Sequence, residues 1–459
     1  MTTTEQAMKY LDDRRDNALD DLKTLLSIPS VSTLPEHEPD MRRAADWLAA
    51  HLRRIGLKRC EILPTGGHPI VYAESLESPG KPTVLIYGHY DVQPVDPLDE
   101  WQSAPFEPAV RGESLFARGA SDMKGQLMAA LKAVEALLHT GGLPLNLKIM
   151  IEGEEEIGSA HLAQFIEANA ERLRCDVALN ADAMILRPDL PSLVYSLRGL
   201  AYFELWVRGA EHDLHSGLFG GTVHNPAVVL CELIAGMHDA EGRVTLPGFY
   251  DRVRPLTPED RAALARLPHD DEDWRAQAGS PPALYGEQGY TTVERGGVRP
   301  TLDVNGLYSG FIGEGSKTVL PAKAMAKISM RLVPDQDPAE IVHQLETYLR
   351  GHAPPTVTWK VRDLTSCDPA IVERDSPYVR AAEAALKTVF GVEPVFLREG
   401  GSVPVVNLMQ TQLGVESVLL GFGLPDDNLH APNEKLHLPN YYKGMQTYVR
   451  FLINVAGVP

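Results

Sequence analysis

"MKGQLMAALKAVEALLHTGGLPLNLKIMIEGEEEIGS", residues 123–159, joins a helix pattern to a strand pattern and ends in a dense group of acids. Its first part places apolar residues at helical spacing, at Leu127, Leu131, Val134 and Leu138. The run "LNLKIMIEG" that follows is continuously apolar apart from one lysine, which is typical of a strand buried on both faces. A helix followed by a buried strand indicates an α/β fold.

The same alternation continues on both sides of this stretch. Strands are predicted for "PTVLIYGH" (82–89), "CDVALNAD" (175–182) and "ESVLLGFG" (416–423). Helices are predicted for residues 41–56, for a segment capped by Ser159, and for residues 378–391 and 441–457. We therefore expect an α/β domain with a mostly parallel sheet and helices on both faces.

The pattern changes in the middle of the chain. "LAYFELWVRG", "LDVNGLYSG", "AKAMAKISMRLVP" and "TVTWKVRDL" resemble half-buried strands, with helical segments at 225–239 and 337–352. This order predicts an inserted two-layer βαββαβ domain. The expected division is residues 1–197 and 366–459 for the α/β domain and 198–365 for the inserted domain, with residues 251–299 as a long excursion of the latter.

Composition limits the classes of partner. The 459 residues carry a formal charge of -19, which disfavours binding to nucleic acid or to anionic membranes. The first 22 residues lack the apolar core of a secretion signal, and no apolar run is long enough to span a bilayer. The four cysteines are widely spaced without a CxxC pair. We expect a cytoplasmic protein that binds neither nucleic acid nor membrane.

The acids of "EGEEEIGS" need an explanation, because four of the five residues 152–156 are glutamates: Glu152, Glu154, Glu155 and Glu156. Two carboxylates about 4 Å apart repel by roughly 4 kcal/mol near a protein surface. One interpretation is a solvated acidic loop. The other is a cation site, in which bound metal ions neutralise the glutamates.

The positions of other metal-binding residue types favour the cation site. The residues that follow predicted strands or precede predicted helices are His89, Asp91, Asp122, Glu155, Glu156, Asp182 and His430. Open α/β sheets bind ligands at this rim. Two imidazoles with several carboxylates and no thiolate suit Zn²⁺, Mn²⁺ or Co²⁺. A pair of such ions can activate a water beside a carboxylate base, so the pattern indicates a dinuclear hydrolase of acyl bonds.

Six motifs in consistent order resemble the M20 metallopeptidase family, most closely its carnosine and cysteinylglycine dipeptidase branch. They are "GHYDVQP", "ARGASDMKGQ", "EGEEEIGS", "DLHSGLFGG", "REGGSVP" and "LHAPNEK", and the resemblance runs from about Leu25 to the carboxyl terminus. It implies two divalent metal ions per subunit, Zn²⁺ or Mn²⁺ with Co²⁺ as a further option, and a dipeptide or short-peptide substrate with a free carboxyl terminus.

The resemblance also implies roles for individual residues. His89 and Asp182 are expected to bind one ion, Glu156 and His430 the other, and Asp122 both. Asp91 is expected to orient His89, and Glu155 to act as general base. Glu154 is left without a role, as are His51, His68 and His161.

In the inserted domain, called the lid and dimerisation domain in this family, three residues match family positions. His215 matches a histidine that crosses a homodimer interface to polarise the scissile carbonyl of the other subunit. Arg331 matches an arginine that pairs with the substrate carboxylate, and Thr318 matches a further substrate contact, as does Ser402 of "REGGSVP". The alternatives are a local loop contact of His215 with Asp213 or Ser216, and a surface ion pair for Arg331.

One motif departs from the family. Asp182 stands in "NADA", between Ala181 and Ala183, whereas the family usually has Ser before this carboxylate and Thr or Asn after it. The ligand is kept, and its hydrogen-bonded support is expected to differ.

The sequence as a whole predicts a dinuclear metal-dependent dipeptidase that works as a homodimer. An N-acyl amino acid amidohydrolase is the nearest alternative, because the same metal centre attacks either amide. A non-catalytic metal-binding protein of the same fold is the third hypothesis, and the intact Glu155 argues against it.

Overall fold

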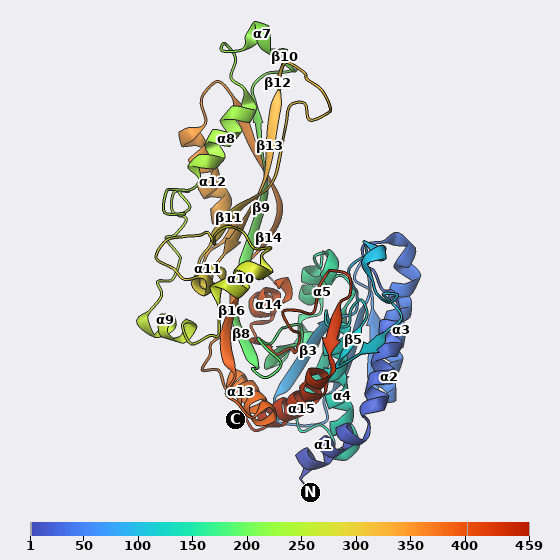
Figure 1. The fold of residues 1–459 in the computed structure, drawn as a ribbon. Coiled ribbons are helices and arrows are strands. Elements are labelled where there is room, and N and C mark those ends of the chain that lie inside the picture. The colour runs from blue at the N-terminus through green and yellow to red at the C-terminus, as the bar shows by residue number, and fades with distance from the viewer. Residues whose placement is uncertain (1, 402, 459) are drawn as a thin grey trace. The chain divides into compact units, whose positions relative to one another are not determined.

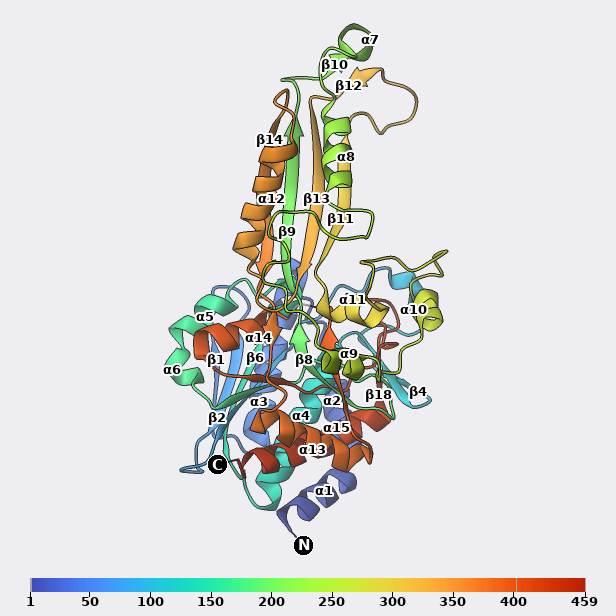
Figure 2. The ribbon, with the colours of Figure 1, turned by 90° about the vertical axis from the view of Figure 1, so that its left-hand side faces the viewer.

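The chain divides into two units in the computed structural model, which describes residues 2–401 and 403–458. The first unit comprises residues 1–195, 372–397 and 404–459, and the second comprises residues 196–371 and 398–403. Figure 1 and Figure 2 trace the chain through both units from two directions.

A nine-stranded sheet, formed mostly by strands of the first unit, is the largest sheet among the described residues. Along the sheet the strands are β1 (Arg59–Leu63), β2 (Ile70–Ser75), β6 (Asn146–Glu152), β3 (Thr83–His89), β7 (Val177–Asn180), β17 (Ser417–Leu419), β8 (Ser192–Leu197) and β15 (Ala370–Ile371), with β16 (Val395–Glu399) also paired to β8. The middle strands β6, β3, β7 and β17 run parallel. The outer pairs β1–β2, β2–β6, β17–β8 and β8–β15 are antiparallel. The predicted α/β class is confirmed, with antiparallel additions at both edges.

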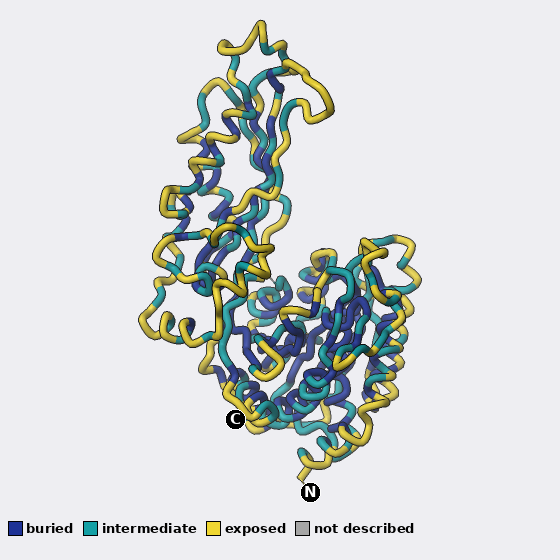
Figure 3. Tube along the Cα trace, viewed as in Figure 1, coloured by how far each residue is buried: buried dark blue, intermediate teal, exposed yellow. Residues whose placement is uncertain are grey.

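Helices cover this sheet. They are α1 (Thr3–Asp13), α2 (Arg15–Leu26), α3 (Glu38–Arg54), α4 (Lys124–Thr140), α5 (Leu162–Ala168), α6 (Ala170–Leu173), α13 (Pro377–Phe390), α14 (Pro404–Leu408) and α15 (Leu438–Val455). Consecutive residues of β3, β6 and β7 are buried, so both faces of the sheet are covered, as the dark blue segments of Figure 3 also show.

Two local features differ from expectation. Helix α5 begins at Leu162 with His161 as its N-cap residue, so the prediction that Ser159 caps this helix is wrong. Ser159 instead has a left-handed φ of 51° at the end of the acidic loop. Helices α1 and α2 were not predicted, because charged residues interrupt their apolar stripes.

The second unit has the predicted βαββαβ order: β9 (Gly199–Arg208), α8 (Pro226–Gly236), β11 (Thr301–Ser309), β13 (Lys323–Leu332), α12 (Pro338–His352) and β14 (Thr358–Cys367). Its strands form an antiparallel sheet in the order β11-β13-β9-β14. Helices α8 and α12 cover one face, as both ribbon views show. The core between the layers includes Phe203, Leu205, Ile328 and Leu345.

Residues 251–299 form an excursion with three short helices, α9 (Pro258–Leu264), α10 (Asp271–Gln277) and α11 (Thr292–Val298). Arg299 anchors its end: the guanidinium donates to both carboxylate oxygens of Glu287, at 2.7 and 2.8 Å, and stacks on Tyr250 and Tyr290. Among residues 2–401 and 403–458, no helix combines the length and the apolar character needed to cross a bilayer.

Candidate metal centre

The side chains that were predicted to meet at one rim of the sheet come from adjacent strand ends of the first unit. His89 is the last residue of β3 and Asp182 lies two residues beyond β7, its neighbour. Glu155 and Glu156 lie in a short 3₁₀ turn after β6, the neighbour on the other side. Asp122 precedes helix α4, and His430 lies in the loop between β17 and β18 (Lys435–His437).

A first group of possible metal ligands consists of His89, Asp122 and Asp182. His89 Nε2 lies 3.1 Å from Asp122 Oδ1 and 3.7 Å from Asp182 Oδ2. The imidazole is fully buried.

A second group consists of Asp122, Glu156 and His430. His430 Nε2 lies 3.0 Å from Asp122 Oδ2 and 3.3 Å from Glu156 Oε2. Asp122 therefore belongs to both groups, with one carboxylate oxygen facing each imidazole. We call these five residues, His89, Asp122, Glu156, Asp182 and His430, the ligand cluster.

Two further residues support the ligand cluster through hydrogen bonds. Asp91 Oδ2 accepts the backbone N–H of Glu156 at 3.0 Å, while its Oδ1 and carbonyl oxygen lie 3.3 and 3.1 Å from His89 Nδ1. Gln93 donates from Nε2 to Glu156 Oε2 at 2.8 Å. Asp91 thus contacts residues of both ligand groups.

The electrostatics of the ligand cluster follow from burying acids beside imidazoles. Burial disfavours ionisation of Asp122, but hydrogen bonds with His430 and His89 outweigh it and lower the pKa of this carboxyl. Hydrogen bonds to Asp122 and Glu156 raise the pKa of His430 to about 10. For His89 burial opposes protonation, yet hydrogen bonds to Asp122, Asp182 and Asp91 raise its pKa well above the usual range.

The other three acids of the site have too little positive charge around them to offset burial, so their pKa values are raised. Burial, reinforced by the charges of Asp182, Asp122 and Glu156, raises the pKa of Glu155 to about 8 against the opposing effect of His89. Burial and the charge of Asp122 raise the pKa of Asp182 and of Glu156 as well.

This donor set fits divalent metal ions. Imidazole nitrogens and carboxylate oxygens from two overlapping groups lie within 4.8 Å of one another in each group. Zn²⁺ and Mn²⁺ take such ligands, and an ion replaces the imidazolium proton because a histidine ligand must be neutral.

Two of the four glutamates have hydrogen-bond partners that account for their burial without a cation. Glu152 accepts from the hydroxyl of Tyr87 at 2.6 Å. Glu154 accepts from the backbone N–H of His68 at 3.0 Å and lies 2.8 Å from His161 Nδ1. Both glutamates are buried and are accommodated by hydrogen bonds. The other two are Glu156, a member of the ligand cluster, and Glu155 beside it.

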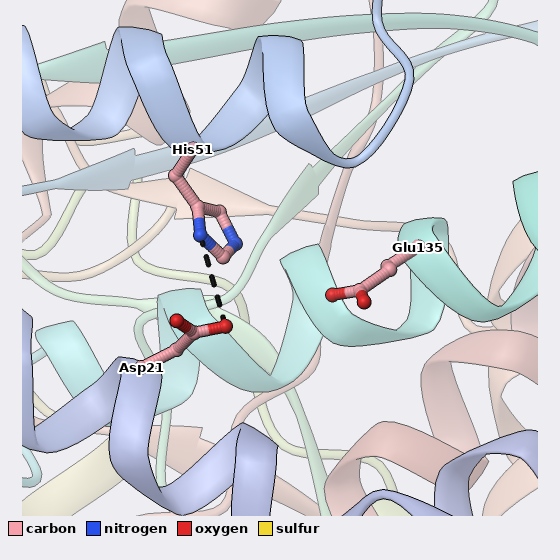
Figure 4. A group of neighbouring side chains, drawn as sticks. All are labelled: Asp21, His51 and Glu135. Carbon is pink, nitrogen blue, oxygen red and sulfur yellow. Dashed lines mark ion pairs between the residues drawn. The ribbon is translucent and has the colours of Figure 1, made fainter.

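A third acidic group lies elsewhere in the first unit, where Asp21, His51 and Glu135 converge from three helices (Figure 4). The ammonium of Lys132 lies 2.5 Å from Asp21 Oδ2 and 2.6 Å from Glu135 Oε2. Arg54 donates to Asp21 at 2.6 Å. Side-chain cations already neutralise these carboxylates, so we assign no metal to this group.

The other predicted site residues belong to the second unit. His215 ends the short strand β10 (Leu214–His215), is exposed, and accepts the N–H of Gly217 at Nδ1 (3.0 Å). Thr318 lies beside it, because its carbonyl oxygen accepts the N–H of Ser216 at 3.1 Å. Ser402 lies outside the described residues.

Arg331 lies on β13, in register with Leu200 of β9. A second arginine is close by: burial and the positive charge of Arg331 lower the pKa of Arg198 to about 10. Asp303 opposes this effect on the pKa of Arg198, so the two guanidinium groups share their surroundings with at least one carboxylate.

The "NADA" departure has a structural counterpart. The backbone N–H of Asp182 donates to Oδ1 of Asn180 at 2.8 Å, and Ala181 and Ala183 are buried. Asn180, two residues before the ligand, therefore supplies a hydrogen bond that holds this turn.

Sequence reasoning missed several supporting residues. Gln93 and Glu434 stand inside "GHYDVQP" and "LHAPNEK", yet no role was assigned to them. Glu154 was set aside and is nevertheless buried and hydrogen-bonded. Their place inside motifs was the available signal, but their partners lie up to about 300 residues away in the chain.

Comparison with known proteins gives one consistent result. The model of "Peptidase family M20/M25/M40" matches residues 85–454. The chain is 33% identical to the Cys-Gly metallodipeptidase dug1 of Schizosaccharomyces pombe, over 99% of this chain and 98% of the relative. It is 31% identical to the Beta-Ala-His dipeptidase of Homo sapiens, over 98% and 92% of the two chains.

A solved structure agrees with these relatives. The M20 family metallo-carboxypeptidase Sso-CP2 from Sulfolobus solfataricus superposes with a TM-score of 0.85 at 35% identity, over 96% of this chain and 99% of the other. The residues matched by the family model, 85–454, include all five residues of the ligand cluster. The chain is therefore a member of peptidase family M20/M25/M40 and an enzyme of the metallopeptidase class.

Proposed function

We propose that this enzyme is a dinuclear metallodipeptidase that hydrolyses the amide bond of dipeptides or short peptides with a free carboxyl terminus. The observation that carries the proposal is Asp122, whose two carboxylate oxygens lie 3.1 and 3.0 Å from imidazoles of two separate ligand groups. A shared carboxylate between two such groups suits a pair of ions. His89 and Asp182 would hold one ion, and Glu156 and His430 the other. The ions are Zn²⁺ or Mn²⁺.

Divalent ions held there would lower the pKa of a bound water and polarise the scissile carbonyl. Glu155 would accept a proton from the attacking water and pass it to the leaving amine as the amide bond breaks. Cations bound beside this buried carboxyl would lower its pKa from the raised value, so that it could accept a proton near neutral pH. Asp91 keeps His89 in one orientation through the outer ring nitrogen.

Two observations support a substrate with a free carboxylate. The relatives are named as acting on Cys-Gly and β-Ala-His dipeptides, and the solved neighbour is named a metallo-carboxypeptidase. All three names describe cleavage next to a carboxyl-terminal residue. Arg331, with Arg198 nearby, offers the guanidinium that a carboxylate prefers, and Thr318 and Ser402 are further substrate contacts in this proposal.

The test of function compares three matched substrates with purified, metal-loaded protein: an unblocked dipeptide, its carboxyl-terminal amide, and the N-acetyl form of the second residue. We expect efficient cleavage of the unblocked dipeptide alone, with two ions per chain by elemental analysis. Cleavage of the N-acetyl amino acid with an inert dipeptide would instead support the amidohydrolase. Metal binding without hydrolysis of any amide would support the non-catalytic alternative.

We also propose that the enzyme is a homodimer formed through the second unit. Strand β11 is an edge strand of that unit's sheet, since it ends the order β11-β13-β9-β14. It and the loop after it expose apolar side chains: Val304, Leu307, Tyr308, Phe311 and Ile312. An exposed apolar edge strand is a common association surface.

Within that dimer, His215 of each subunit acts at the site of the other. Mixing His215→Ala subunits with Glu155→Ala subunits tests this role, because one of the two sites in a mixed dimer then has both residues intact. Partial recovery of activity is expected. Absence of recovery, with subunit exchange shown by mass spectrometry, would remove His215 from the neighbour's site.

A further inference from the structure

Glu434 connects the loop that carries His430 to the segment that carries Asp122. Its side chain is 1% exposed, and it lies directly before strand β18. One carboxylate oxygen, Oε1, accepts the backbone N–H groups of Ser121 and Asp122 at 2.9 and 3.0 Å. The other, Oε2, accepts the backbone N–H of Gly119 at 2.8 Å and the guanidinium of Arg118 at 2.9 Å.

These four donors belong to one short segment, residues 118–122, that ends at the carboxylate shared by both ligand groups. The backbone of Glu434 contacts the same segment, since its carbonyl oxygen accepts the N–H of Ala117 at 3.1 Å. Arg118 is itself fixed by a hydrogen bond to the carbonyl oxygen of Pro94. A single buried carboxylate therefore binds the backbone N–H groups of Gly119, Ser121 and Asp122.

A second link runs parallel to the first. Asp427 is fully buried, and its Oδ2 accepts the hydroxyl of Ser121 at 2.6 Å and the N–H of Leu424 at 2.8 Å. Lys435 lies 3.2 Å from the other oxygen and donates its backbone N–H to the carbonyl oxygen of Asp427. Both ends of the His430 loop are thus fastened to the Asp122 segment or to each other.

The loop between these links needs such fastening. His430 has a left-handed φ of 60°, and Asn428 and Asn433 have φ values of 56° and 62°. Such conformations cost free energy outside glycine and persist where surrounding contacts enforce them. The side chain of Asn433 supplies two of these contacts, with the N–H of Gln102 and the carbonyl oxygen of Glu100.

We propose that Glu434 is a positioning residue of the metal centre: it holds Asp122 at the distance from His430 at which both carboxylate oxygens of Asp122 can serve ions. The inference rests on the proposed dinuclear function and assigns no direct metal contact to Glu434. Residues that orient metal ligands in this way commonly change metal affinity by about 10- to 100-fold when they are replaced.

Glu434→Gln is the main test variant. It preserves size but turns one acceptor into a donor, so one pair of N–H groups, at 118–119 or at 121–122, loses its partner. Glu135→Gln is the matched control. Glu135 lies on helix α4, which follows Asp122, and its largely buried side chain is drawn with Asp21 and His51 in Figure 4. It accepts hydrogen bonds from Lys132 and Tyr10 and belongs to neither ligand group.

The experiment titrates Mn²⁺ alone into metal-free protein by calorimetry and follows amide hydrogen exchange at Ser121 and Asp122 before metal is added. Wild type and Glu135→Gln are expected to bind two Mn²⁺ with equal affinity. Glu434→Gln is expected to bind at least one ion about 10- to 100-fold more weakly and to exchange both amides faster. If Glu434→Gln does not fold, Glu434→Asp replaces it, since it keeps the charge beside Arg118 but is too short to reach every donor.

The outcomes separate the two proposals. Unchanged Mn²⁺ affinity and exchange in the Glu434 variants, with normal binding by wild type, would overturn the positioning role alone. Equal losses of affinity in Glu135→Gln and Glu434→Gln would also overturn it, because general destabilisation then explains both. Failure of the wild type to bind either Mn²⁺ or Zn²⁺ would overturn the dinuclear function, and this inference with it.

Discussion

Replacing Glu155 by Gln is expected to make the metal-free enzyme more stable while removing its activity. In the folded, metal-free molecule the pKa of Glu155 is raised from its ordinary value of 4.5 to about 8, chiefly by burial and then by neighbouring acids. The unfolded chain loses this proton above pH 4.5, whereas the folded chain keeps it up to about pH 8. The wild type is therefore progressively destabilised as the pH rises through that interval.

The size of this destabilisation follows from the pH interval between the two pKa values, 4.5 and about 8. Each pH unit costs the wild type about 1.4 kcal/mol, so the penalty reaches about 3 kcal/mol at pH 7 and about 5 kcal/mol above pH 8. The glutamine side chain of the variant does not ionise and escapes the penalty. Glu155→Gln is therefore expected to exceed the wild type in unfolding free energy by about these amounts. Below pH 4.5 the difference disappears.

The assay is urea unfolding of both proteins, with a chelator present, at several pH values from 5 to 8. Glu113→Gln serves as control, because that carboxylate is largely exposed and its loss is expected to change little. Activity of metal-loaded Glu155→Gln is expected to fall by about 10²- to 10⁴-fold or more with metal content retained. A stability difference that does not grow between pH 5 and pH 7 would refute the buried-acid reasoning, and substantial remaining activity would refute the role of Glu155 as base.

Three other predictions concern metal, pH and assembly. Chelation of the wild type is expected to abolish hydrolysis and lower the melting temperature. Mn²⁺ at about 100 times its dissociation constant should restore about 2.7 kcal/mol of unfolding free energy per ion. Activity that survives complete metal removal would contradict the metal centre. Burial and then Lys132 lower the pKa of His51 to about 4, so that between pH 6.5 and 4 only the unfolded chain takes up the proton and the wild type loses about 1.4 kcal/mol of stability per pH unit as the pH falls. His51→Gln is expected to remove this loss. The same pH dependence of the unfolding free energy in variant and wild type, measured with urea, would exclude the effect. Leu307→Arg is expected to yield monomers in analytical ultracentrifugation with the fold intact by circular dichroism, and a stable dimer would exclude the β11 edge as the interface.

Much of the fold could be predicted from local patterns. Strand β3 runs Thr83–His89 and helix α4 runs Lys124–Thr140, close to the predicted bounds, because buried strands and amphipathic helices leave periodic apolar residues in the chain. The inserted βαββαβ unit was predicted for the same reason. The outer strands β1 and β2 were missed, since their short mixed segments have neither a long apolar run nor a clear alternation.

The sequence by itself determined which residue types stand at the strand ends and that they match the motifs of one family. Only the tertiary structure decided how each acid is stabilised: Glu152 by Tyr87, Glu154 by His68 and His161, and the segment of Asp122 by Glu434. The physical reason is the distance along the chain between the residues that interact. Periodicity reports whether a residue is buried by its own helix or strand, whereas a hydrogen bond between residues about 300 positions apart depends on strand order and loop path, which no local pattern encodes.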